Sequence, residues 1–150
     1  MKLNTVSLKN VERGFPVLAE QVLFAQLSAE VKPKKNSDGQ NLEITCRILD
    51  EVVTKKDGTE MNNANGKLSF KYFISLEATE KYDPNKSLAM VSDAIKNDPE
   101  QDLELEHIEG AYVKVKLGIQ APRDGRDEQN VVKSLLPIRD EDGFTPPAMQ

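Results

Sequence analysis

Two stretches of the sequence place lysine and aromatic side chains at alternating positions, where a β-strand would turn them to one side. The residues concerned are Lys67, Lys71 and Phe73 in the first stretch and Tyr112, Lys114 and Lys116 in the second. Lysines two positions apart on a strand lie about 7 Å apart, close to the phosphate spacing of an extended nucleic-acid strand. A ring between them can stack on a base, which is worth about 1–3 kcal/mol. If the two stretches share one surface, the pattern predicts binding of single-stranded nucleic acid.

Further cations would flank this surface. They are Arg47 on the outward face of another predicted strand, Lys32, Lys34 and Lys35 in a turn, and Arg123 and Arg126 in a charged loop. A purely structural interpretation also fits, because lysines are common on the solvent side of antiparallel sheets and protect exposed edges. The rings of Phe24, Phe73 and Tyr112 could likewise pack under a loop or a helix. The residue pattern leaves both interpretations open.

Catalysis has little support in the sequence. Residues 97–109 are rich in carboxylates, but these alternate with apolar residues and are typical of a solvated face. A metal site or an acid–base pair needs converging groups, which this spacing does not specify. The one histidine, His107, lies in that run and is expected at the surface, while Cys46 alternates with core residues and is expected to be buried. No glycine-rich phosphate loop is present, and we expect no catalytic activity, metal or cofactor.

The negative charge of the chain is concentrated in two places. The 150 residues carry a net charge of −5, which would argue against a nucleic-acid partner if it were spread evenly. Residues 97–109 contribute −6 and residues 139–150 contribute −2, so the remaining residues carry +3. The rest of the chain is therefore mildly basic and compatible with binding phosphates.

Length and hydropathy predict a single domain outside the membrane. A chain of 150 residues with 38% hydrophobic residues suits one core. No apolar run approaches the roughly 18–20 residues of a membrane span, and the first residues do not resemble the apolar region of a signal peptide. We expect a cytoplasmic protein with no membrane partner.

Alternating apolar residues predict five strands. They cover residues 21–31, 42–49, 68–76, 110–119 and 131–138. A helix is expected from Pro84 to Asn97, with a short helical turn at residues 105–108. The stretch 54–66 is polar, contains two turn signals, is long for a hairpin connection and is expected to be mobile.

Three strands, a helix and two strands are the layout of an OB-fold. We therefore predict a mainly β fold, a five-stranded antiparallel Greek-key barrel with one helix between strands 3 and 4. An open sheet with one helix packed on it is the alternative. The predicted organisation is an N-terminal extension or short strand at residues 1–20, the OB-fold domain at residues 21–138, and an acidic, disordered tail at residues 139–150.

The order of these elements resembles that of bacteriophage OB-fold single-stranded DNA-binding proteins. The resemblance covers the strand 22–31 running into Lys32-Pro33-Lys34-Lys35, the strands 42–49 and 68–76, the helix, the Gly110-led strand and a closing strand. It implies binding of single-stranded DNA without sequence preference during phage replication or recombination.

The resemblance also gives the tail a role. The residues Asp140, Glu141, Asp142 and Phe144 are similar in kind to acidic tails that recruit replication or recombination proteins. A tail of this kind could also compete with DNA for a basic groove, or be only a frayed end. The main alternative function is a non-catalytic phage structural or protein-interaction module. A small metal- or carboxylate-dependent enzyme would require several carboxylates of residues 98–109 to converge in a pocket.

Overall fold

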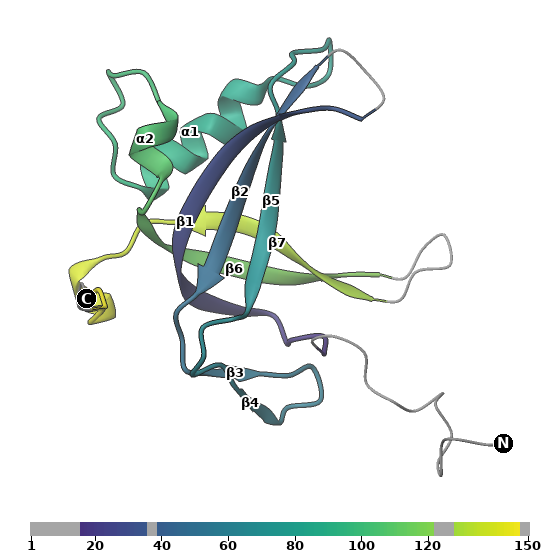
Figure 1. Cartoon of the computed structure of the whole chain (residues 1–150), viewed down its shortest axis with the longest axis vertical. Helices are drawn as coiled ribbons and strands as arrows, with labels where there is room; N and C mark the ends of the chain where they lie inside the picture. Colours follow the sequence, from purple (N-terminus) through teal and green to yellow (C-terminus); the bar gives the residue numbers. More distant parts are fainter. Residues whose placement is uncertain (1–15, 36–38, 122–127, 148–150) are drawn as a thin grey trace, which may run out of the picture.

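A five-stranded antiparallel sheet forms the centre of the computed structural model, which describes residues 16–35, 39–121 and 128–147 (Figure 1). The spatial order of the strands is β5-β2-β1-β6-β7. Their bounds are β1 Gln21–Pro33, β2 Gln40–Ile48, β5 Ser69–Ser75, β6 Tyr112–Gln120 and β7 Gln129–Leu136. All pairings are antiparallel, and the predicted mainly β class is confirmed.

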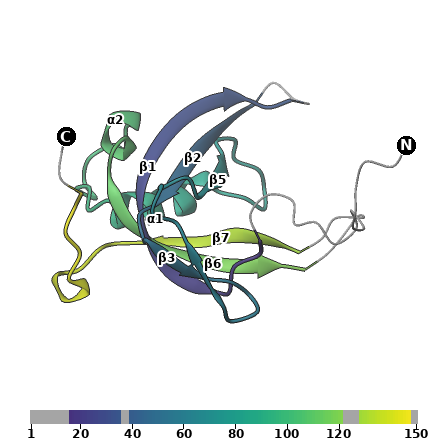
Figure 2. The same ribbon diagram turned by 60° about the horizontal axis from the view of Figure 1, so that its bottom comes forward.

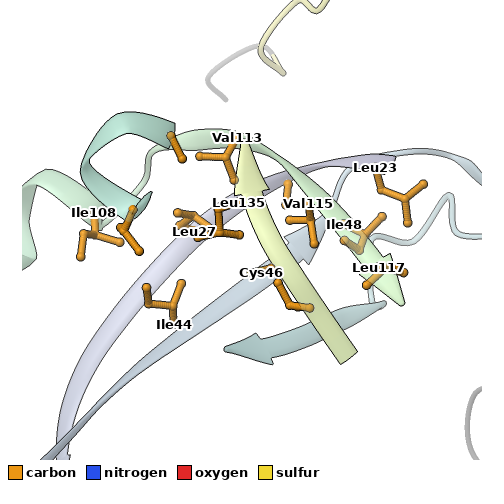
Figure 3. Close-up of a cluster of buried hydrophobic side chains, with 14 of the residues drawn as sticks. Leu23, Leu27, Ile44, Cys46, Ile48, Ile108, Val113, Val115, Leu117 and Leu135 are labelled. Carbon is orange, nitrogen blue, oxygen red and sulfur yellow. The ribbon is translucent and has the colours of Figure 1, made fainter. Parts of the chain in front are cut away.

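The inner face of the sheet carries the apolar residues whose alternation predicted the strands. Leu23, Ala25 and Leu27 of β1 are almost fully buried. They belong to one core with Ile44 and Cys46 of β2, and with inward-facing valines and leucines of β6 and β7 (Figure 3). Burying each large aliphatic side chain contributes about 1.5–3 kcal/mol, so the pattern also fixes which face points outward.

The sheet is not closed into a barrel, which corrects that part of the predicted fold. The edge strands β5 and β7 approach each other, but no hydrogen-bonded ladder joins them among the described residues. Helix α1, Pro84–Ala94, packs against both edge strands. Its Val91 and Ala94 are fully buried, so a helix covers the core where strand pairing would have closed a barrel.

The helices lie where the sequence predicts them. Pro84 occupies the first turn of α1, and Asp83 caps that turn by accepting the N–H of Asn85. A short helix, α2, covers Leu105–Ile108. In the part of the chain that the structure describes, no helix has the length and apolar character needed to cross a membrane.

A second, two-stranded sheet lies below the first in Figure 1. Its strands are β3, Val52–Thr54, and β4, Glu60–Asn62, joined by the turn that contains Asp57 and Gly58. The sequence predicts neither of these strands. The pairing needs only three residues a side, too few to produce a visible alternation.

Residues just before β1 belong to the folded unit. Leu18 is fully buried, and its N–H and C=O both bond to the side-chain amide of Asn130 on β7. The predicted boundary at residue 20 therefore falls within a packed segment. Residues 1–15 of the predicted N-terminal extension or short strand lie outside the described residues.

Asn63, which follows β4, likewise joins separate backbone segments through its side-chain amide. We expect its replacement to destabilise the fold. Its amide donates to the carbonyls of Ile48 and Asp50 and accepts the N–H of Leu68, while only 7% of the residue is exposed. Asn63→Ala leaves these buried groups unpaired and should lower the free energy of unfolding by about 2–4 kcal/mol. Urea denaturation measures the change.

Asn62→Ala is the matched control, because Asn62 accepts only an exposed N–H, that of Ala64. It should change stability by less than about 0.5 kcal/mol. Equal stabilities of the two variants would contradict the role assigned to Asn63.

Candidate nucleic-acid interface

The strand register brings the outward-facing candidate residues onto one continuous surface, here called the outer face. Gln26 lies opposite Arg47 on one side and Tyr112 on the other, and Arg47 lies opposite Ser69. These four residues therefore form a row that crosses β6, β1, β2 and β5. Figure 2 shows how these strands are arranged. Gln26 also links the row chemically, since its Oε1 accepts from Arg47 Nη2 at 2.8 Å and its Nε2 lies 3.5 Å from the Tyr112 hydroxyl.

The rings on the outer face fall into two groups. Phe73 on β5 is 56% exposed and lies opposite Glu43. Phe24 and Tyr112 are covered by Phe144 from the end of the chain, with ring centroids 4.8 Å and 5.6 Å from that of Phe144. Packing under another segment, the structural alternative for these rings, thus applies to Phe24 and Tyr112 but not to Phe73.

The C-terminal segment folds back onto the outer face instead of extending freely. A 3₁₀ helix covers Asp140–Asp142, and Asp142 lies 3.0 Å from the ammonium of Lys114. The N–H of Arg139 donates to Asp142, and this bond together with Lys114 lowers the pKa of the Asp142 carboxyl. Asp142 and Phe144 therefore pack against the sheet, where the sequence predicts a disordered tail, while Asp140, Glu141 and residues 145–147 stay exposed.

Glu43 engages two of the candidate lysines. Its carboxylate lies 2.6 Å from the ammonium of Lys71 and 3.1 Å from that of Lys32, although Glu43 is only 8% exposed. Bonding to Lys71 and Lys32 lowers the pKa of Glu43, and Glu43 raises the pKa of Lys32. The three side chains, on β5, β2 and β1, form one compact ionic cluster on the outer face.

The remaining candidate cations differ in their surroundings. Lys34 bonds to the hydroxyl of Ser75 at 2.6 Å and lies 3.5 Å from Glu77. Lys35 and Lys116 are exposed. Arg123 and Arg126 lie outside the described residues.

Arg47 and Lys67 line a groove of about 360 Å³ between β1, β2 and the start of β5. Ser28, Thr45 and Ser69 contribute hydroxyls to it, and Glu109 forms part of its wall. The Arg47 guanidinium packs over Gly66, where a Cβ would lie 3.5 Å from Nη1. That distance is an ordinary contact, so the preference for glycine in this turn comes from the φ of +61° at Gly66.

The acidic segment forms a separate, shallow hollow lined by Glu100, Asp102, Glu104 and His107. His107 Nδ1 accepts the N–H of Glu104 and so caps α2. Among the described residues, no group of three or more His, Cys, Asp or Glu side chains is arranged to hold a metal ion. Cys46 is fully buried on the inner face, and burial raises the pKa of its thiol to about 12.

The sequence prediction did not identify Gln26 and Glu43 as part of the candidate site. Both lie on outward faces directly opposite candidate residues, Gln26 opposite Arg47 and Tyr112 and Glu43 opposite Phe73, and their outward place in the alternation is the signal that could have drawn attention to them. Their roles depend on cross-strand register, because Glu43 meets lysines from two other strands.

Comparison with protein-family models finds none that matches this chain. Comparison with curated proteins likewise finds no match.

We expect the contact of the C-terminal segment to depend on pH. Because the pKa of Asp142 is lowered in the folded protein, its contribution is present above the ordinary aspartate range and is lost as pH falls through the lowered value. NMR signals of the Phe144 ring should therefore shift towards those of an exposed ring on acidification. In Asp142→Asn this titration should disappear. If the Phe144 signal of the unmodified protein does not change with pH, Asp142 does not hold the segment in place.

Proposed function

We propose that this protein binds single-stranded DNA without sequence preference and supports phage DNA replication or recombination. The observation that carries the proposal is the shared outer face, on which the exposed cations Arg47 and Lys67 lie with the exposed ring of Phe73. Cations attract the phosphates and release counterions, while an exposed ring accepts any base by stacking. Neither interaction reads base edges, so the binding is independent of sequence.

We further propose that the sheet is an open form of the OB-fold. In support, one helix of two or more turns lies between the third and fourth strands of the five-stranded sheet, and β1 pairs with both β2 and β6. OB-folds bind oligonucleotides across the face of strands 2 and 3, which correspond to β2 and β5 in this order. Arg47, Lys71 and Phe73 lie on those two strands.

In this proposal the C-terminal segment competes with DNA for part of the outer face. Phe144 stacks where a base would stack, and Asp142 pairs with a lysine that a phosphate would otherwise approach. When DNA displaces the segment, its acidic side chains become available to replication or recombination proteins in the host cytoplasm. The exposed Asp140 and Glu141 are the residues best placed to make a first contact with such a partner.

Fluorescence anisotropy with a labelled oligo-dT tests the function directly. We expect micromolar or tighter binding that weakens steeply with salt and exceeds binding to a duplex of equal length. Phe73→Ala should weaken it about 5- to 150-fold, the equivalent of 1–3 kcal/mol of stacking.

Val52→Ala is the matched control for Phe73→Ala, because Val52 is similarly exposed, at 51%, but lies on the β3–β4 hairpin. It should leave the affinity unchanged. If the unmodified protein does not bind at low salt, the proposal is wrong and a protein-interaction module becomes the better interpretation of this sheet.

Two truncations test competition by the C-terminal segment. Removing residues 139–150 should tighten oligo-dT binding about two- to tenfold at low salt, since an aromatic stacking contact is worth about 0.5–1.5 kcal/mol. Removing only residues 145–150 retains Asp142 and Phe144 and should leave the affinity as it is. The same affinity for both truncations would rule out competition through these two residues.

A further inference from the structure

Four of the candidate lysines already neutralise carboxylates of this chain. Lys32 and Lys71 pair with Glu43, Lys34 with Glu77 and Lys114 with Asp142. A lysine that stays paired with a carboxylate does not neutralise a phosphate, and so does not release the cations condensed on the nucleic acid, whose release drives much of the binding. The number of lysines on the outer face therefore overstates the charge available for DNA.

Glu43 is the carboxylate least able to give up its partners. It is 8% exposed and held from both sides, at 2.6 Å by Lys71 and at 3.1 Å by Lys32. The two lysines hold different oxygens of the carboxylate, Lys71 at Oε1 and Lys32 at Oε2, so a phosphate that took both lysines would have to replace both bonds. Both lysines should remain with Glu43 when a strand binds nearby.

Arg47 and Lys67 are in the opposite situation. Within the described part of the chain, neither has a carboxylate at salt-bridge distance, and both are exposed. Arg47 donates one of its N–H groups to Gln26. This hydrogen bond holds the guanidinium over the Gly66 turn and leaves the other N–H donors for a ligand. The guanidinium fork matches the oxygens of a phosphate.

The groove that these two cations line is chemically suited to a sugar–phosphate unit. Its other polar groups include the hydroxyls of Ser28, Thr45 and Ser69, and no aromatic ring lines it. Its 360 Å³ falls within the range of small-ligand sites. The carboxylate of Glu109 also lines the groove and accepts the N–H of Ala29 at 2.9 Å, so the lining, with two cations and one anion, keeps a net charge of +1.

We infer that this groove holds the phosphates of a bound single strand through Arg47 and Lys67, while Glu43 withholds Lys32 and Lys71 from them. The inference rests on the proposed function and specifies which charges carry it. Bases attached to the held backbone then reach Phe73, which lies on β5 beyond the edge of the groove. Phosphate binding and base stacking thus occur at separate places on the outer face.

The salt dependence of oligo-dT affinity tests this division. For single strands, each neutralised phosphate contributes about 0.7 to the slope of log affinity against log salt. The double variant Arg47→Gln/Lys67→Gln should therefore reduce the slope by about 1.4. The control Lys86→Gln/Lys96→Gln removes the same charge from exposed positions on or beside α1 and should leave the slope unchanged.

The variant Glu43→Gln provides a second test of the inference. It removes the carboxylate partner of Lys71 and leaves Lys32 with Glu30 alone, at 3.7 Å, with little change in side-chain shape, so the slope should steepen by about 0.7 for each lysine that then takes a phosphate. Phe73→Ala should reduce affinity without changing the slope, because a ring neutralises no phosphate.

The outcomes separate this inference from the proposed function. If the unmodified protein binds oligo-dT but the Arg47/Lys67 variant keeps its slope, or loses no more slope than the α1 control, the inference is wrong and the function stands. A Glu43→Gln slope equal to that of the unmodified protein overturns the withholding role. Absence of binding by the unmodified protein overturns both proposals.

Discussion

The architecture depends on a single strand that satisfies backbone hydrogen bonds on both of its sides. β1 pairs with β2 along residues 25–33 and with β6 along residues 21–26. Among the described residues, the β2–β5 pair and the β6–β7 pair are therefore joined by strand hydrogen bonds only through β1, which curves along its length between them (Figure 1). This shared strand makes the inner face one core and the outer face one surface, so that Tyr112 and Arg47 can belong to the same row.

Neutral amide side chains continue the pairing where the strands stop. Asn63 bonds to the backbone after β2, Asn130 bonds to the backbone before β1, and Gln21 bonds to both Ala19 and Thr54. An amide offers both donors and an acceptor, so it can replace a peptide group without introducing a charge into a poorly hydrated place. The second hairpin and the N-terminal segment are thereby attached to the sheet by directional bonds as well as by apolar contact.

Much of the fold could be predicted because burial of one sheet face produces a period of two, and burial of one helix face produces spacing such as that of Leu88, Val91 and Ile95. The closure of the sheet into a barrel could not be predicted from side-chain periodicity. Whether β5 pairs with β7 depends on backbone edges, and no side-chain pattern records that α1 covers the gap. The β3–β4 hairpin was not predicted because three paired residues on each strand are too few to produce a periodic pattern.

The sequence predicts which face of the sheet carries the candidate residues, but not how the charges on that face pair with one another. Alternation alone correctly places Lys71 and Phe73 on the outward side of β5. The cluster of Lys32, Glu43 and Lys71 joins three strands, so it exists only once the register of two pairings is known. Likewise, nothing in the acidic C-terminal segment specifies that Phe144 will meet Phe24 and Tyr112.

The double pairing of β1 also orders events while the chain is being made. β1, β2 and β5 leave the ribosome early and can form a three-stranded meander, but β1 then presents residues 21–26 as an unpaired edge. That edge stays open until β6, whose residues 112–117 lie near the far end of the chain, has been synthesised. Contacts between such distant segments slow folding, and open edges invite pairing with other chains. The nascent protein is therefore most vulnerable to aggregation in the interval before β6 arrives.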